Sequence, residues 1–216
     1  MRLLLVRHGE SLGNAENRFQ GREEYPLTER GLEQARRLAE RLRRECGAVD
    51  AVYSSPQGRA LQTAECVAEA LSMAVIPDPR LREYHIGMLT GLTMDEARER
   101  FPRLQELRAR DGETFVPIPG EEGREALAQR VGEALDDYRA QYTDGQTVVV
   151  VSHGGALGAV LCRLVGLPAD RPGPFRLSNA SLSIVELANG RARLVGLNDT
   201  CHLAGSHLNG GGGSDD

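Results

Sequence analysis

Apolar runs and helical repeats alternate along much of the chain. Residues 3–6 are wholly apolar, which is typical of a strand covered on both faces, and residues 148–152 (VVVVS) are apolar up to the final serine. Residues 49–53 form a third short segment that predicts a strand. Each of these strands precedes a stretch with apolar residues at helical spacing, directly or after a loop. This order predicts a mostly parallel sheet.

Capping residues indicate where the helices begin and end. Thr28 is placed to cap a helix that follows the first long loop. Ser55 and Pro56 predict the start of a second helix, with serine as the cap and proline at the first helical position. Residues 154–165 predict a largely apolar helix that ends at Gly166.

The last third of the chain carries a different pattern. Residues 181–187 and 193–198 alternate between apolar and polar positions, and Asn189-Gly190 between them is a strong hairpin signal. Residues 210–216 read GGGGSDD, a composition that predicts a disordered tail. We expect residues 1–209 to form one domain.

A segment at residues 92–123 interrupts the rhythm of strands and helices. It contains a helical pattern over residues 93–110, with a break at Pro102, and then a proline-rich loop. Segments of this kind commonly lie over a sheet edge and shape a pocket. We therefore predict a three-layer α/β/α sandwich with a mostly parallel central sheet and a small helical cap over the C-terminal strand edge.

Composition and charge narrow the classes of function. With 40% hydrophobic and 26% charged residues, the 216-residue chain is typical of an ordinary folded protein. Its net charge of -5 argues against a protein that coats nucleic acid or an anionic membrane. No apolar stretch approaches the roughly 18 residues of a membrane span, so we expect a cytoplasmic location. Four widely spaced cysteines are interpreted as reduced and mostly buried packing residues: Cys46, Cys66, Cys162 and Cys201.

Histidines and arginines follow the predicted strands at one edge of the sheet. Arg7 and His8 come directly after the first strand, Arg59 lies in the first turn of the second helix, and His153 follows the strand at residues 148–152. A lone histidine at a strand end is more often structural than catalytic. However, ligands of such sheets bind where the parallel strands end, and an arginine near a helix N-terminus fits a phosphate bound there. Together the four residues predict a phosphate site.

The chemistry of phosphoryl transfer calls for these residue types. A planar guanidinium group can donate two parallel hydrogen bonds to two phosphoryl oxygens. A neutral imidazole such as that of His8 can attack phosphorus, with its other ring nitrogen donating to a backbone carbonyl. The leaving alkoxide then needs a proton, and Glu83 is the candidate acid. No set of His, Cys and carboxylate residues has metal-ligand spacing, so we expect neither a metal nor another cofactor.

The sequence around these residues resembles the histidine phosphatase superfamily, which includes the cofactor-dependent phosphoglycerate mutases. The resemblance covers residues 2–203 and rests on LVRHGES at 5–11 with Asn14, NRFQG at 17–21, PLTERG at 26–31, YSSP at 53–56 continuing to RALQTA at 59–64, LRE at 81–83 with Gly87 and Gly91, and VSHGG at 151–155. It implies His8 as nucleophile and Glu83 as proton donor. It also implies a phosphate pocket made of Arg7, Arg59 and His153, helped by Ser11, Asn14, Gln20 and the backbone of Gly21 and Gly154.

Two positions separate a phosphatase from a mutase. The mutases it resembles have an arginine directly after the acid and a lysine shortly after the next Gly-Leu, where this chain has Tyr84 and Thr93-Met94. Without these cations a bisphosphorylated intermediate is held less well. We therefore expect hydrolysis by water to be faster than the rotation of this intermediate that a mutase needs. We therefore expect a phosphatase for a small phosphorylated metabolite, similar to broad-specificity phosphatases. A phosphoglycerate mutase and a non-catalytic phospho-ligand binding module are the alternatives. Substrate specificity is expected from cap residues Arg108, Arg110, Phe115, Val116 and Ile118.

Overall fold

A six-stranded sheet forms the centre of the molecule in the computed structural model, which describes residues 1–102, 118–168 and 174–204. The strands are β1 (Arg2–Arg7), β2 (Ala51–Ser54), β3 (Val75–Pro77), β4 (Thr147–Ser152), β5 (Leu182–Ala188) and β6 (Arg191–Asp199), in the spatial order β3-β2-β4-β1-β5-β6. Strands β1 to β4 are parallel, whereas β5 and β6 are antiparallel to their neighbours. The predicted α/β architecture with a mostly parallel sheet is confirmed.

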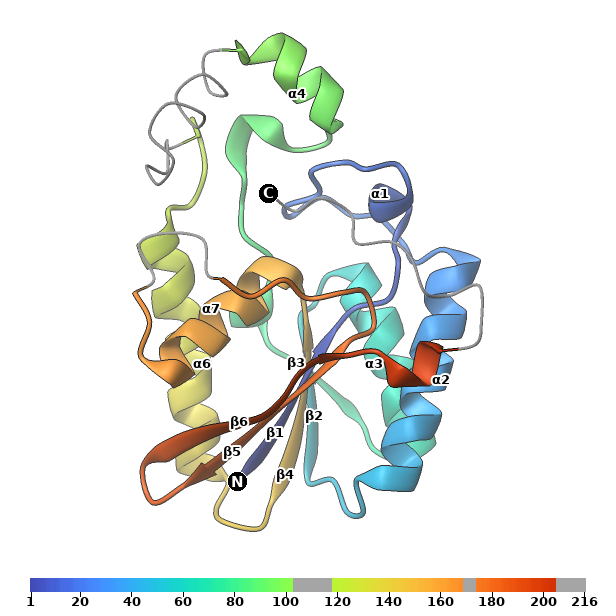
Figure 1. The fold of residues 1–216 in the computed structure, drawn as a ribbon, viewed down its shortest axis with the longest axis vertical. Coiled ribbons are helices and arrows are strands. Elements are labelled where there is room, and N and C mark those ends of the chain that lie inside the picture. The colour runs from blue at the N-terminus through green and yellow to red at the C-terminus, as the bar shows by residue number, and fades with distance from the viewer. Residues whose placement is uncertain (103–117, 169–173, 205–216) are drawn as a thin grey trace.

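Helices cover both faces of this sheet (Figure 1). Helices α2 (Glu29–Glu45) and α3 (Gly58–Leu71) pack on one face, and α6 (Arg124–Gln141) and α7 (Gly154–Val165) pack on the other. Strand β1 serves both layers, since Leu4 and Val6 face the first pair of helices while Leu3 and Leu5 face the second. This two-sided burial explains why the strand is apolar at successive positions.

The helix ends agree only partly with the sequence-based predictions. Thr28 caps α2 as expected, because its side chain accepts from the Gly31 amide. The predicted start at Ser55-Pro56 is wrong, since α3 begins at Gly58 with Gln57 as its N-cap. The Ser55 hydroxyl lies instead 2.8 Å from a ring nitrogen of a histidine in the neighbouring loop. Helix α6, with its buried face of leucine, valine and tyrosine side chains, is an element that the sequence analysis did not single out.

The cap is described only in part. Helix α4 (Met94–Arg100) is capped by Thr93 and ends before Phe101, so the predicted helix over residues 93–110 is interrupted ahead of Pro102. This agrees with the weak helical preference of a residue that precedes proline. Ile118 is buried against Leu89 and Ala97. The other predicted specificity residues, Arg108, Arg110, Phe115 and Val116, and the tail at 210–216 lie outside the described residues.

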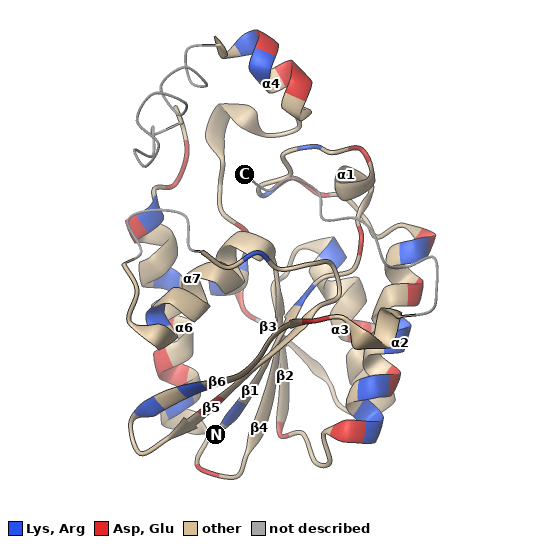
Figure 2. Ribbon diagram, viewed as in Figure 1, with Lys and Arg blue, Asp and Glu red and all other residues tan. Residues whose placement is uncertain are grey.

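Charged residues of both signs lie along the outer surfaces of the helices (Figure 2). On α2, Arg37 pairs with Glu33 and Arg43 with Glu40, all on the exposed side. No helix among the described residues has the length and apolar character to cross a lipid bilayer. The four cysteines are free thiols, but only Cys162 is buried, so the expectation that most of them are buried is wrong.

Candidate active site

The parallel strands bring the two histidines side by side. Strands β1 and β4 pair with Arg7 opposite Ser152, so His8 and His153, each one residue further on, leave the sheet at the same edge. Their ring centroids are 5.1 Å apart. Arg59 lies in the first turn of α3, which follows the neighbouring strand β2. All four side chains are buried, with exposed fractions of 4% or less.

Hydrogen bonds fix the orientation and the tautomer of His8. Its Nδ1 lies 2.7 Å from the carbonyl oxygen of Gly9. Because a carbonyl can only accept, Nδ1 carries the proton and Nε2 keeps its lone pair. The backbone of His8 is held by Ser152, whose carbonyl accepts from the His8 amide, and by Ala180, whose amide donates to the His8 carbonyl, both at 3.0 Å.

Burial and neighbouring cations keep both imidazoles neutral. Burial, and then the positive charges of Arg59 and Arg7, lower the pKa of His8 well below its ordinary value. Burial also lowers the pKa of His153, assisted by Arg59. The Nε2 atom of His153 lies 2.8 Å from the Ser55 hydroxyl, while Nδ1 is buried without a hydrogen-bond partner among the described residues.

Backbone carbonyls hold the two guanidinium groups in place. Arg59 donates from Nη1 to the carbonyl of Glu23 and from Nη2 to that of Gly21, both at 2.8 Å. Arg7 donates from Nη1 to the carbonyl of Leu177. Gly21 has a φ of +50°, and an added Cβ would lie 2.7 Å from the side chain of Ile86, so this tight turn favours glycine. The carbonyl of Gly21 is thus engaged by Arg59.

Glu83 comes from a third segment and lies at the start of the helix that follows His153. It follows the short 3-10 helix η1 (Pro79–Leu81), and its carboxylate lies at the N-terminus of α7, the helix that starts directly after His153. Oε2 accepts from the Gly155 amide and Oε1 from the Ala156 amide, both at 3.0 Å. The structure therefore places Glu83 beside the second histidine, with Gly154 between that histidine and the two donating amides.

The remaining predicted residues form a polar cluster around the short helix α1 (Leu12–Ala15). Ser11 caps this helix, and its hydroxyl lies 2.9 Å from Asn14 Oδ1 and 2.7 Å from Gln20 Oε1. Asn179 connects the cluster to the nucleophile candidate, since its Nδ2 donates to Asn14 Oδ1 at 3.0 Å and to the His8 carbonyl at 3.2 Å. Ser11, Asn14 and Gln20 are thus joined to His8 through Asn179.

Sequence reasoning missed Asn179, Gln57 and the role of Ser55. Asn179 lies just before β5. Because β5 is antiparallel to β1, the amino end of β5 lies at the carboxyl end of β1. The predicted hairpin at the end of the chain could have indicated this position. Gln57 donates from Nε2 to the Gly21 carbonyl at 3.2 Å and accepts from the Glu83 amide at 2.7 Å. No periodicity marks such a bridging residue.

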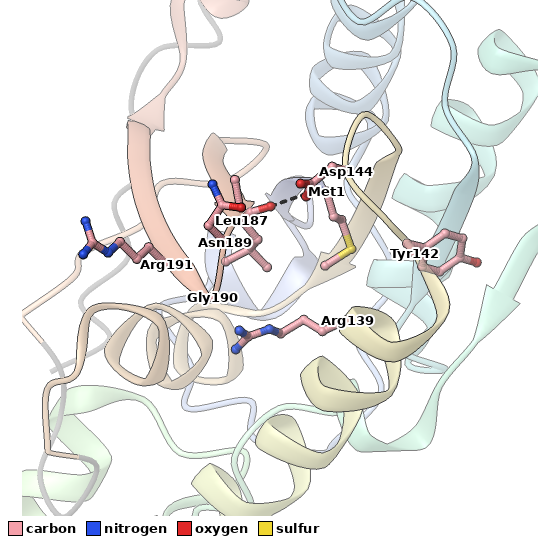
Figure 3. A pocket seen from close by; sticks show the side chains of 9 residues that line it. Met1, Arg139, Tyr142, Asp144, Leu187, Asn189, Gly190 and Arg191 are labelled. Atoms are coloured by element: carbon pink, nitrogen blue, oxygen red, sulfur yellow. Dashed lines mark hydrogen bonds and ion pairs between the residues drawn. The ribbon is translucent and has the colours of Figure 1, made fainter.

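A cavity of about 160 Å³ lies at the opposite edge of the sheet (Figure 3). It is lined by the turn between β5 and β6, by the end of α6 and by Met1, whose amine donates to the Leu187 carbonyl at 2.9 Å. None of the candidate site residues lines it, so the predicted chemistry does not belong to this cavity. In the described part of the chain, no group of three or more His, Cys, Asp or Glu residues is arranged to hold a metal ion.

Fold and site together define a class of protein: a three-layer α/β protein with two neutral histidines and two arginines buried where its parallel strands end. Residues 3–200 match the family model of the histidine phosphatase superfamily, branch 1. The chain therefore belongs to that superfamily, and the resemblance read from its motifs is confirmed.

Three relatives refine this assignment. The chain is 38% identical over 211 residues to the Yersinia pestis protein named "Probable phosphoglycerate mutase GpmB", with 94% of this chain and 95% of the relative covered. The alpha-ribazole phosphatase from Shigella flexneri has a similar structure, with a TM-score of 0.81, 30% identity and coverage of 93% and 97%. A mycobacterial glucosyl-3-phosphoglycerate phosphatase in complex with VO3 gives a TM-score of 0.80, 30% identity and coverage of 91% and 98%. The chain is thus an enzyme of the phosphomonoesterase or phosphoglycerate mutase-like kind.

Proposed function

We propose that the protein hydrolyses phosphate monoesters of small metabolites through a phosphohistidine on His8. The observation that carries the proposal is the state of His8, which is buried, neutral and fixed with its Nε2 lone pair available. The guanidinium groups of Arg7 and Arg59 would neutralise the phosphoryl oxygens, and the buried Nδ1 of His153 would find a partner there. The proposed partner is a small phosphorylated metabolite, with no role for nucleic acid or membrane.

The proposed reaction has two balanced steps. In the first, Nε2 of His8 forms a bond to phosphorus as the ester P–O bond breaks, and Glu83 protonates the departing alkoxide. In the second, Glu83 takes a proton from water, whose oxygen attacks phosphorus and breaks the P–N bond. Inorganic phosphate leaves, and His8 returns to its neutral form with Glu83 again protonated. Each step uses side chains of this chain alone, so the proposal includes no metal or other cofactor.

Trapping the intermediate tests this proposal. Brief reaction with a phosphate ester labelled on phosphorus, followed by quenching in base, should leave acid-labile, base-stable label on His8. His8→Ala should take up no label and lose a factor of about a thousand or more in turnover, because the covalent route disappears. A chelator should leave the wild-type rate unchanged. Label on a serine or cysteine, or an unchanged intermediate in His8→Ala, would overturn the mechanism. Failure to release phosphate from any ester would favour the binding-module alternative.

A phosphoglycerate mutase is the second candidate, and one contact favours it. The guanidinium of Arg124 lies over the Tyr84 ring, 4.4 Å from its centroid, so a cation is present next to the residue that follows the acid. The Yersinia relative, a probable phosphoglycerate mutase by name, supports the same alternative. Against it, Met94 supplies no charge at the first position of α4. We expect phosphate release to exceed isomerisation when both are followed in one tube with a bisphosphoglycerate primer. Isomerisation much faster than release would establish the mutase instead.

A further inference from the structure

One guanidinium group holds the backbone of the segment that presents Glu83. Arg130, on α6, donates from Nη1 to the carbonyls of Arg80 and Arg82, both at 2.6 Å, and from Nη2 to the carbonyl of Glu83 at 3.0 Å. Three carbonyls within four residues therefore converge on a single side chain. The guanidinium has several donors in a rigid plane, so it can fix the path of this turn in a way that a single bond cannot.

A second arginine reaches the same carbonyl from the phosphate side of the site. Arg22, which directly follows Gly21, donates from Nε to the carbonyl of Glu83 at 3.3 Å. The carboxylate of Glu122 joins the two arginines, because Oε1 accepts from Arg130 at 2.7 Å and Oε2 accepts from Arg22. The Arg130 and Glu122 side chains are only 17% and 11% exposed, so solvent screens this pair much less than a surface ion pair.

These contacts complete the restraint on Glu83. Its carboxylate is held by the amides at the start of α7, its own amide donates to Gln57 Oε1 at 2.7 Å, and its carbonyl is held by the two arginines. A proton donor must lie within hydrogen-bond reach of the leaving oxygen. A displacement of about 1 Å can cost roughly a hundredfold in rate.

We propose that Arg130, supported by Arg22 and Glu122, is a positioning residue for Glu83. This inference rests on the proposed function, in which Glu83 is the proton donor. Arg130 touches neither the phosphoryl group nor the ester in this scheme and acts through the position of Glu83. Its charge is also the last and smallest of the named causes that lower the pKa of His153, and Arg130→Lys keeps that charge. Removal of Arg130 should therefore slow the steps that depend on proton donation and leave phosphate binding intact.

The test compares two leaving groups in Arg130→Met, which keeps a long side chain but removes the donors. An alkyl phosphate such as glycerol phosphate needs protonation of its leaving oxygen, whereas p-nitrophenyl phosphate needs little. We expect kcat/KM, which reports the step that breaks the ester bond and not the later hydrolysis of phosphohistidine, to fall by about tenfold or more for the alkyl ester and by less than about threefold for the phenyl ester. Neither KM value should rise. Arg139→Met removes an exposed arginine from the same helix and should change neither rate.

A double variant separates positioning from general damage. If Arg130 acts through Glu83, then Arg130→Met/Glu83→Gln should be no slower on the alkyl ester than Glu83→Gln alone. Arg130→Lys should restore part of the rate, because an ammonium can still reach a carbonyl. Equal losses on both esters, raised KM values, or losses that multiply with Glu83→Gln would overturn the inference.

Two further variants keep the test decisive. Should Arg130→Met not fold, Arg22→Met removes the weaker bond at a more exposed position, with a side chain 36% exposed, and should show the same leaving-group pattern at smaller size. No difference between the two esters in Arg22→Met would then overturn the proposal. Glu83→Gln by itself reports on the proposed function. If Glu83→Gln slows both esters equally, Glu83 is not the proton donor, and the proposed role of Arg130 fails with it. If Glu83→Gln slows the alkyl ester selectively but the arginine variants do not, only the proposed role of Arg130 is overturned.

Discussion

A methyl group added at Gly155 should disable the proton donor while leaving the fold intact. A Cβ at this position would lie 2.6 Å from Oε1 of Glu83 and 3.3 Å from its carboxyl carbon. Ordinary contact begins at 3.4 Å, so the oxygen must retreat by 3.4 − 2.6 = 0.8 Å. The retreat would lengthen the 3.0 Å bonds that Glu83 accepts from the amides of Gly155 and Ala156.

The size of the effect follows from this displacement. A shift of about 1 Å in a catalytic group can cost roughly a hundredfold in rate. We therefore expect Gly155→Ala to lower kcat/KM, which reports cleavage of the ester bond, by about ten- to a hundredfold for an alkyl phosphate and far less for p-nitrophenyl phosphate. Stability should not fall in parallel, because alanine is favoured over glycine within a helix by up to about 1 kcal/mol. The assay is steady-state kinetics on both esters together with a thermal unfolding curve.

Gly158, one turn further along α7, is the matched control. A Cβ there would have no atom of the described residues within 4 Å outside the backbone of its own helix. Gly158→Ala should keep full activity and raise the unfolding midpoint by a few degrees, as expected for a gain of about 1 kcal/mol in a chain of this size. Wild-type activity of Gly155→Ala on the alkyl ester, or equal losses on both esters, would refute the reasoning.

Two further predictions concern stability. The folded-state pKa values of His8 and His153 lie below the ordinary 6.5, so the unfolded chain binds more protons just below that pH. Their contribution should be complete above about pH 7.5 and be lost as pH falls below 6.5, at up to about 1.4 kcal/mol per pH unit for each histidine. Thermal midpoints between pH 5 and 8 should show this slope, and His8→Ala should roughly halve it; an unchanged slope would contradict the assignment. Arg41→Met should lower the free energy of unfolding in urea by about 1–3 kcal/mol, because buried Arg41 binds Asp199 at 2.7 Å, and a loss below about 0.5 kcal/mol would show that the pair contributes little.

The strands and the convergence of the site could be predicted from the sequence because each depends on a local pattern. Apolar runs identify β1 and β4, and two parallel strands must deliver the residues that follow them to one edge. That argument places His8 beside His153 without any knowledge of side-chain contacts. Glu83 was found through resemblance and chemistry, since its own segment has no regular pattern.

The parts that could not be predicted depend on contacts between distant segments. Ser55 has the sequence position of a helix cap, but its hydroxyl pairs with His153, and the helix starts three residues later, at Gly58. Asn179 and Arg130 act through backbone carbonyls far away in the sequence, of His8 and of Glu83 and its neighbours. A residue that binds carbonyls leaves no trace in hydrophobic periodicity, because the groups it satisfies are common to all residues.

Residues 85–88, which follow Glu83, are hydrogen-bonded to residues 118–122 at the described end of the cap, and in the proposed function this contact would tie specificity to catalysis. The carbonyl of His85 accepts from the Glu122 amide at 3.0 Å, and the Met88 amide donates to the Pro119 carbonyl at 3.1 Å. A Cβ at Gly87 would lie 2.2 Å from that Pro119 carbonyl, so the two segments approach as closely as glycine allows. We therefore expect a movement of residues 118–122 to displace the segment that carries Glu83. In the proposed function, a substrate that shifts this end of the cap would also shift Glu83, so leaving-group recognition and acid catalysis would act through one connected unit of the fold.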